Sequence, residues 1–139
     1  MKKLNFLVLA LSIFAFTACD KVEDDTMDTT PEYHIHFHSP DSADKTVGET
    51  ITIKIDFEDH NGGTVHHVNV RVYNKADGTE IFNKPSDAHV HETSGMYSFE
   101  DTLELNVDPD TNWVVEAKVW GHEDGLAEVS ETVEFKVVN

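Results

Sequence analysis

The stretch Ile51-Thr52-Ile53-Lys54-Ile55-Asp56-Phe57 alternates apolar and polar residues without interruption. Successive side chains on a β-strand point to opposite faces, so this segment predicts a strand with one buried and one solvated face. The same period of two recurs along the chain from Tyr33 onward, and nothing there sustains the period of 3.6 that an amphipathic helix requires. Turn-forming residues such as Asn61-Gly62-Gly63 separate the alternating segments. The sequence therefore predicts an all-β protein.

The number and spacing of the alternating segments favour one architecture. We expect strands over residues 33–38, 49–57, 65–74, 79–91, 97–105, 113–120 and 129–138, with the fourth broken at Pro85. Short strands spaced by turns in this way are typical of an antiparallel sandwich. The expected fold class is all-β, a seven-stranded antiparallel immunoglobulin/fibronectin-III-like sandwich over residues 33–139, with the apolar side of each strand facing the core.

The N-terminus carries a targeting signal. Met1-Lys2-Lys3 is followed by an apolar run from Leu4 to Phe16 and by Thr17-Ala18, a pattern typical of a secretory signal peptide over residues 1–18. The run is too short for a membrane-spanning helix. Phe16-Thr17-Ala18-Cys19 resembles a bacterial lipobox, with Phe in place of the usual Leu. This resemblance implies that Cys19 is lipidated and becomes the mature N-terminus. The alternative is an ordinary signal peptide with a cysteine near its cleavage site.

A lipidated Cys19 would place the protein in the cell envelope, as an outer membrane lipoprotein on the periplasmic face or the cell surface. Residues 19–32 are acidic and lack apolar periodicity, so we expect a disordered tether between the anchor and the sandwich. Cys19 is the single cysteine, which excludes a disulfide and a thiolate metal site in the domain.

The charge of the mature chain restricts its partners. Loss of Lys2 and Lys3 with the signal peptide reduces the ten Lys and Arg to eight against 27 Asp and Glu, a formal charge of −19. Such a surface repels nucleic acid and attracts cations. We therefore expect no nucleic-acid partner, and we expect the membrane to be contacted through the lipid anchor.

Histidine is the residue type that most suggests a function. The chain has nine histidines, and His34/His36, His36/His38 and His89/His91 form His-x-His pairs. On a strand such pairs lie on one face roughly 6.5–7 Å apart, where two imidazoles can share one cation. In the expected fold, seven histidines gather at one end of the sandwich: His34, His60, His66, His67, His89, His91 and His122. Nearby carboxylates are expected to join them: Glu58, Asp59, Glu92, Glu123 and Asp124.

This gathering predicts a site for a divalent transition metal, Zn, Cu or Ni, which the protein binds without catalysing a reaction. We find no nucleophile elbow, phosphate-binding loop or His-Glu-x-x-His helix, so we expect no enzyme. Three alternatives remain open. The first is a surface-displayed structural module with a protein or glycan partner and no specific metal role. The second is a calcium site in the acidic loops, although the sequence has no regular calcium loop. The third is a pH switch formed by the histidines.

Two further features bear on these alternatives. Trp120 has outward parity on its strand, and it either offers a platform for a sugar or partner or covers the polar face of the sheet. The segment from Phe57 to Val72 and the hairpin around Gly121-His122 resemble the corresponding parts of bacterial immunoglobulin-like modules. More broadly, the signal, strand plan and histidine placement are similar to those of His-rich immunoglobulin-like lipoproteins from Bacteroidota. That resemblance implies the fold and the anchor, and it implies no activity.

Overall fold

The computed structural model describes residues 30–122 and 128–139. The expected signal peptide, Cys19 and all but the last residues of the tether lie outside the described residues, as do Glu123 and Asp124. Within the described ranges, no helix is long and apolar enough to cross a membrane.

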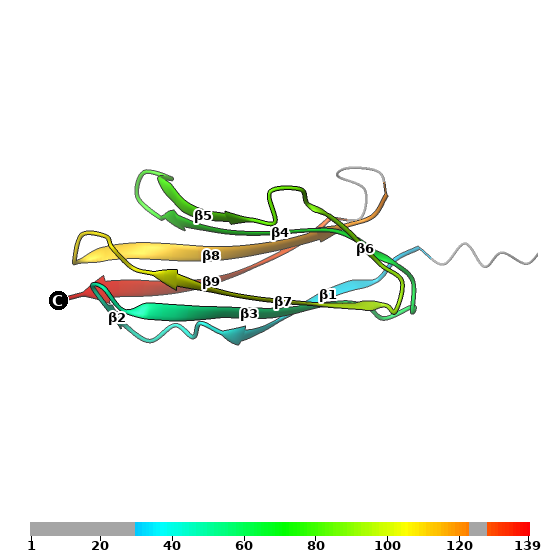
Figure 1. Ribbon diagram of the computed structural model, residues 1–139, viewed down its shortest axis with the longest axis horizontal. Coiled ribbons are helices and arrows are strands. Elements are labelled where there is room, and N and C mark those ends of the chain that lie inside the picture. The colour runs from blue at the N-terminus through cyan, green and yellow to red at the C-terminus, as the bar shows by residue number, and fades with distance from the viewer. Residues whose placement is uncertain (1–29, 123–127) are drawn as a thin grey trace, which may run out of the picture.

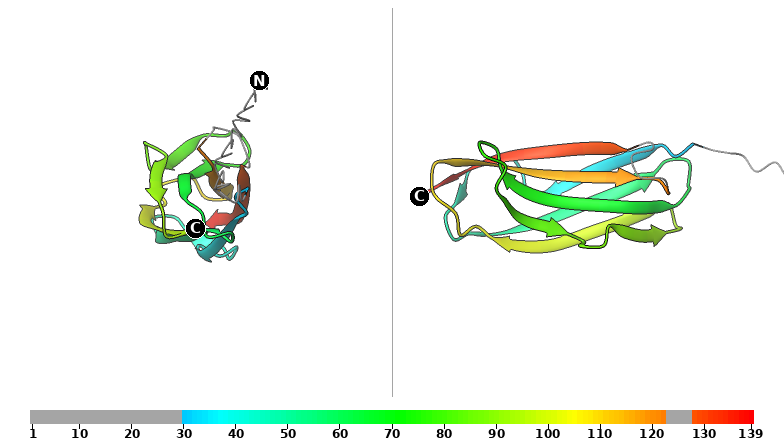
Figure 2. Two further views of the ribbon diagram at one scale, coloured as in Figure 1. Left: turned by 90° about the vertical axis from the view of Figure 1, so that its right-hand side faces the viewer. Right: turned by 90° about the horizontal axis from the view of Figure 1, so that it is seen from above.

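The described chain forms two packed β-sheets whose strands run along the long axis of the molecule (Figure 1). The smaller sheet has the order β1-β3-β7, with β1 at Tyr33–Ser39, β3 at Thr50–Asp59 and β7 at Met96–Glu104. The larger sheet has the order β2-β9-β8-β4-β5, and β6 also pairs with β4. Its strands are β2 (Lys45–Thr46), β4 (Val65–Asn74), β5 (Glu80–Lys84), β6 (His89–Glu92), β8 (Thr111–Trp120) and β9 (Val129–Val138). The two layers are seen end-on in Figure 2.

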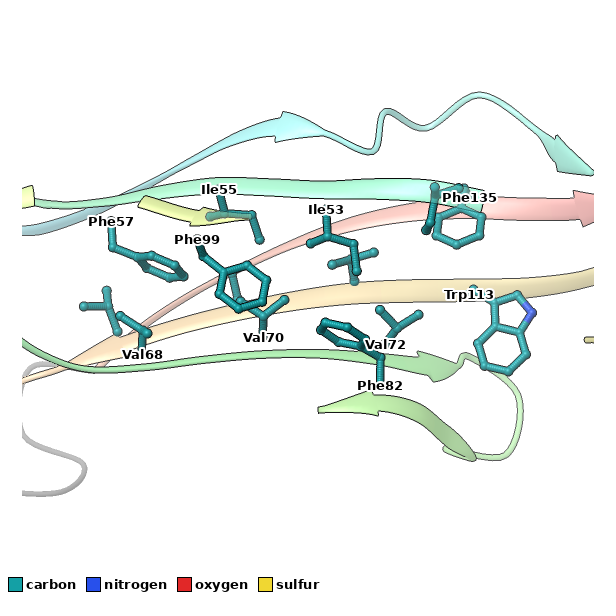
Figure 3. Close-up of a cluster of buried hydrophobic side chains, with 14 of the residues drawn as sticks. Ile53, Ile55, Phe57, Val68, Val70, Val72, Phe82, Phe99, Trp113 and Phe135 are labelled. Atoms are coloured by element: carbon teal, nitrogen blue, oxygen red, sulfur yellow. The ribbon is translucent and has the colours of Figure 1, made fainter. Parts of the chain in front are cut away.

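The alternation in the sequence becomes the core of the sandwich. Ile53, Ile55 and Phe57 of β3 are fully buried, whereas the residues between them face solvent or are half-buried. Fully buried valines of β4 point toward them from the larger sheet, and Phe99 of β7 packs between the layers (Figure 3). Removing this apolar surface from water is the main stabilising contribution to such a fold. The predicted immunoglobulin-like sandwich is confirmed.

The break expected at Pro85 in the fourth strand, residues 79–91, is confirmed. The two parts are the short strands β5 and β6, and both pair with β4 in antiparallel orientation. Pro85 lies between them, and because proline lacks an N–H it cannot continue a hydrogen-bonded ladder. The structure also adds β2, a two-residue strand parallel to β9 that the alternation did not predict. These additions give nine strands in the described residues rather than seven.

Asp59 links two chain segments by hydrogen bonds at the end of the sandwich where most of the histidines lie. Its carboxylate is buried, and Oδ1 accepts hydrogen bonds from the backbone N–H groups of Glu32 and Asn61, each at 3.0 Å. The Tyr33 hydroxyl donates to the carbonyl oxygen of Thr64 at 3.2 Å. Burial and the charge of Asp59 raise the pKa of Tyr33, which keeps this hydroxyl a donor. The start of β1 and the β3–β4 loop are therefore fixed to each other.

Candidate metal centre

An irregularity in β4 brings two adjacent histidines to the same side of the larger sheet. Val65 and Val68 are both fully buried although they are three residues apart, and the pairing register with β6 shifts between Val65 and His67. In a regular strand His66 and His67 would face opposite sides. An extra residue in a strand removes that alternation, so both imidazoles lie outside the core, with ring centroids 5.9 Å apart.

β6 supplies two more histidines opposite β4. His89 is the register partner of His67, and their ring centroids are 5.0 Å apart. His91 has a left-handed backbone with φ of 51°, and its ring meets that of His66 edge-on with centroids 4.7 Å apart. The rings of His89 and His91 are themselves 5.5 Å apart. The pair predicted from the His-x-His spacing is therefore joined to β4.

The end of β8 completes this group. The His122 ring lies 5.0 Å from the His66 ring. His67 stacks almost parallel on Trp120, with centroids 5.3 Å apart, and its Nδ1 lies 2.8 Å from the carbonyl oxygen of Gly121. Because a carbonyl only accepts, Nδ1 of His67 donates, and Nε2 of the neutral ring keeps a free lone pair. We call these residues the five-histidine cluster: His66, His67, His89, His91 and His122.

His66 is the centre of the five-histidine cluster. Its Nδ1 is shielded from solvent and has no hydrogen-bond partner among the described residues. Burial and then the neighbouring histidines, led by His91, lower its pKa, so the ring favours the neutral form that binds metals. One ligand nitrogen each from His66, His89 and His91 lie within 4.8 Å of one another. Nitrogens about 2.0–2.1 Å from a single Zn²⁺ are separated by roughly 3.4 Å, so small side-chain movements would close this group on an ion.

The remaining histidines of the same end lie on the smaller sheet. His34 stacks on His60 with ring centroids 3.7 Å apart, and His36 lies 6.4 Å from His34. Glu58 Oε2 lies 3.6 Å from His36 Nε2 and 3.4 Å from His60 Nε2. Among the described residues, no ring contact joins these three histidines to the five-histidine cluster. The structure thus divides the seven predicted histidines into two groups.

The carboxylates expected beside the histidines have different positions. Glu58 lies beside His36 and His60, whereas Asp59 is an internal anchor whose carboxylate binds backbone N–H groups. Glu92 accepts a hydrogen bond from the backbone of Ser94, which lowers its pKa, and it belongs to none of the metal-competent groups in the described residues. Asp59 and Glu92 are thus engaged by backbone N–H groups, and neither belongs to a metal-competent group among the described residues. Short turns at the strand ends use these side chains for backbone hydrogen bonds.

Sequence reasoning left His36 and Glu32 out of the candidate set. The shared parity of His34 and His36 was the signal that could have included His36, because both side chains lie on the polar face of β1. His38, the third histidine of that face, instead pairs with Asp56 through Nε2 and Oδ2 at 2.7 Å. His38 is thus a histidine outside both groups.

No protein-family model matches the chain, and no curated protein matches it. Among solved structures, it is similar to the CARDB domain of a Pyrococcus furiosus protein in its solution NMR structure. The TM-score is 0.50 at 19% identity, over 78% of this chain and 95% of that one. A crystal structure of that domain in complex with di-metal ions gives a TM-score of 0.49 at 19% identity, over 79% and 90% of the two chains. Murine CRIg gives 0.42 at 17% identity, over 76% and 99%. The likeness shows the fold alone: an immunoglobulin-like β-sandwich of the kind found in CARDB domains.

Proposed function

We propose that this protein binds a divalent transition-metal ion, Zn²⁺, Cu²⁺ or Ni²⁺, at the five-histidine cluster. The ion is bound for capture, buffering or transfer, with no catalytic step. His66, His89 and His91 supply the first three nitrogens, and His67 and His122 stand next to them as further ligands. In this proposal the site lies on the outer surface of the larger sheet, where β4 begins beside β6 and β8 ends.

The observation that carries the proposal is the shielded Nδ1 of His66, which has no hydrogen-bond partner within residues 30–122 and 128–139. A shielded ring nitrogen that makes no hydrogen bond costs free energy, about 1–3 kcal/mol for a neutral group. Four other imidazole rings have centroids within 5.9 Å of the same ring. An ion bound at the cluster would satisfy several of these nitrogens together, which explains why the chain tolerates such crowding of a single residue type.

The tautomer of His67 also supports metal binding. Its Nδ1–H is held by the Gly121 carbonyl, and such a partner directs the opposite nitrogen toward a metal. Stacking on Trp120 restricts the rotation of the ring. His67 therefore needs little reorganisation to become a ligand.

The proposal includes attachment to the cell envelope through lipidated Cys19, on the basis of the signal peptide and lipobox-like sequence. The test is the distribution of the full chain between membrane and soluble fractions of a Gram-negative host. Wild-type protein is expected in the membrane fraction with an acylated N-terminus by mass spectrometry. Cys19→Ser should move it to the soluble fraction, and membrane retention of that variant would contradict the anchor.

The metal site is tested by calorimetric titration of the full chain, purified without chelator and without a histidine tag. We expect binding at micromolar affinity or tighter for Zn²⁺, Cu²⁺ or Ni²⁺, with proton release near pH 6–7. His89→Ala with His91→Ala should remove this binding event. His38→Ala is the matched control, since His38 lies outside both groups and should leave the binding unchanged.

Two outcomes would contradict the proposal. Unchanged binding in the His89/His91 double variant would exclude these ligands. Only weak, salt-screened binding by the wild type would make the histidines surface residues and would favour a displayed module with a protein or glycan partner. Circular dichroism of each variant without metal establishes that a loss of binding is not a loss of fold.

A further inference from the structure

A second group of potential ligands lies on the outer face of the smaller sheet, separate from the five-histidine cluster. Antiparallel pairing of β1 with β3 sets His34 opposite Glu58, and His36 shares the face of His34. His60 follows the end of β3 and stacks on His34. The β1–β3 register therefore brings imidazoles and carboxylates from two chain segments together: Glu32, His34, His36, Glu58 and His60.

The distances in this group suit an ion better than they suit hydrogen bonds. One ligand atom each from His36, Glu58 and His60 lie within 4.8 Å of one another, and the same holds for Glu32, His34 and His60. The imidazole–carboxylate distances are 3.4 Å for His60–Glu58 and 3.6 Å for His36–Glu58 and His34–Glu32. These separations exceed the 2.7–3.2 Å of a good N–H···O hydrogen bond. Direct ion pairing between such exposed groups contributes little, so it does not account for the arrangement.

The backbone that carries these ligands is held in place. Glu32 N–H donates to the buried Asp59, and His60 N–H donates to the Glu32 carbonyl at 2.9 Å. Asn61 Nδ2 donates to the Thr30 carbonyl at 2.9 Å. These bonds fix the first described residues to the β3–β4 loop, so the ligands at both ends of the group start from a restrained geometry. Such support for ligand-bearing backbone is what a pre-organised site requires.

We propose that this group is a second divalent-metal site, with His60, Glu58 and His36 as its principal ligands and Glu32 and His34 completing it. Its chemistry differs from that of the five-histidine cluster. Two carboxylates neutralise the charge of a divalent ion and add oxygen ligands, which favours Zn²⁺ and also admits Mn²⁺. The five-histidine cluster offers neutral nitrogen ligands, which favour Cu²⁺ and Ni²⁺ more strongly. The protein then holds two ions on opposite sheets, with different preferences.

The test compares Zn²⁺ and Mn²⁺ binding by the full chain and by two sets of variants. The wild type should bind two equivalents of Zn²⁺. Glu58→Gln keeps the size of the side chain and removes its charge. It should lower the affinity for one equivalent of Zn²⁺ by more than the roughly tenfold to hundredfold loss seen when an outer-shell partner is removed. It should also abolish Mn²⁺ binding measured by electron paramagnetic resonance. His36→Ala with His60→Ala should remove the same equivalent.

The proposal is overturned if Glu58→Gln and the His36/His60 double variant both keep two equivalents of Zn²⁺ at wild-type affinity. It is also overturned if the wild type binds a single equivalent that is lost in the His89/His91 double variant. The experiment judges the two sites separately. If the five-histidine cluster binds no metal, one equivalent of Zn²⁺ should still bind, and it should be lost in Glu58→Gln and unchanged in the His89/His91 double variant. Nuclear magnetic resonance of the imidazole protons of His60 gives a direct reading in protein that keeps all its histidines: Zn²⁺ should shift them, and unshifted signals at saturation would refute the site.

Discussion

The left-handed backbone of His91 directs its ring onto His66, with the two rings nearly perpendicular at 80° and their centroids 4.7 Å apart. A residue with a Cβ at positive φ is less stable by roughly 1–2 kcal/mol than in the usual regions. Strain of this kind gathers at functional sites. The strained backbone of His91 lies at the candidate metal centre. This backbone positions the His91 ring, which supplies one of the three nitrogens that can converge on an ion.

His91→Gly and His91→Ala separate the cost of this backbone from the role of the ring. Both remove the imidazole, but only glycine adopts positive φ without strain. We expect His91→Gly to be more stable than His91→Ala by about 1 kcal/mol in urea unfolding without metal. Both variants should bind the five-histidine cluster's ion more weakly than the wild type. Equal stability of the two variants would show that the backbone at position 91 is not strained.

The stability of the metal-free protein should depend on pH through His66. Its pKa is lowered from 6.5, first by burial and then by His91, His122, His67 and His89. The unfolded chain therefore takes up a proton at a higher pH than the folded chain. Stability should be full above about pH 6.5 and should fall as the pH drops below that value toward the folded pKa.

Urea unfolding with chelator at pH 8, 7, 6 and 5 measures this effect. His66→Gln should give a flatter pH profile than the wild type, because glutamine removes the proton uptake at the centre of the cluster. His38→Ala should follow the wild-type profile near pH 6 more closely than His66→Gln does. A His66→Gln profile as steep as that of the wild type would assign the pH dependence to other groups.

The strands and the core were predictable because a sandwich strand is covered on one face. Burial on one side forces a period of two, and residues such as Ile53, Ile55 and Phe57 show it directly in the sequence. Pro85 likewise predicted the gap between β5 and β6. These signals are local, so they do not depend on which strands pair.

The division of the site was not predictable in the same way. Placement of all seven histidines at one end followed from the strand plan, but the sheet that each one faces depends on pairing and register. The irregularity at Val65–His67 places His66 and His67 on the same side of the larger sheet. No residue in that stretch predicts the irregularity from the sequence. The expected fourth strand also turned out to contain β6, whose pairing with β4 brings His89 to His67. Long-range contacts decided what the local pattern left open.

Asp59 should stabilise the fold through its side-chain oxygen Oδ1 rather than through its negative charge. Both of its backbone hydrogen bonds end on Oδ1, and an asparagine in the same orientation keeps that oxygen. We expect Asp59→Ala to lower the free energy of unfolding by about 2–4 kcal/mol, since two N–H groups lose their acceptor. Asp59→Asn should retain most of the stability. Thermal and urea unfolding of the two variants test this, and equal losses would contradict the assigned role of Oδ1.

Gly63 gives an independent test of the same anchor. A Cβ at this position would collide with Asp59 Oδ2, well inside van der Waals contact. Because Oδ1 of the same carboxylate is held by hydrogen bonds, the side chain cannot move away freely. Gly63→Ala should therefore destabilise the protein by about 1–3 kcal/mol. In an Asp59→Ala background the clash is absent, so the added loss from Gly63→Ala should shrink, and simple additivity would argue against the contact.

Trp120 should report ion binding at the five-histidine cluster, because its ring stacks on His67 with an interplanar angle of 7°. Cu²⁺ held by the neighbouring imidazoles would lie close enough to quench its fluorescence. Trp113, the other tryptophan, is buried, and its Nε1 donates to Thr111 at 2.8 Å, so its emission should change less.

Titration of the wild type with Cu²⁺ should therefore give strong quenching that Trp120→Phe largely removes. The His89/His91 double variant should weaken the quenching at equal Cu²⁺ concentration, whereas His36→Ala with His60→Ala should not. Quenching that persists in Trp120→Phe would locate the bound ion elsewhere.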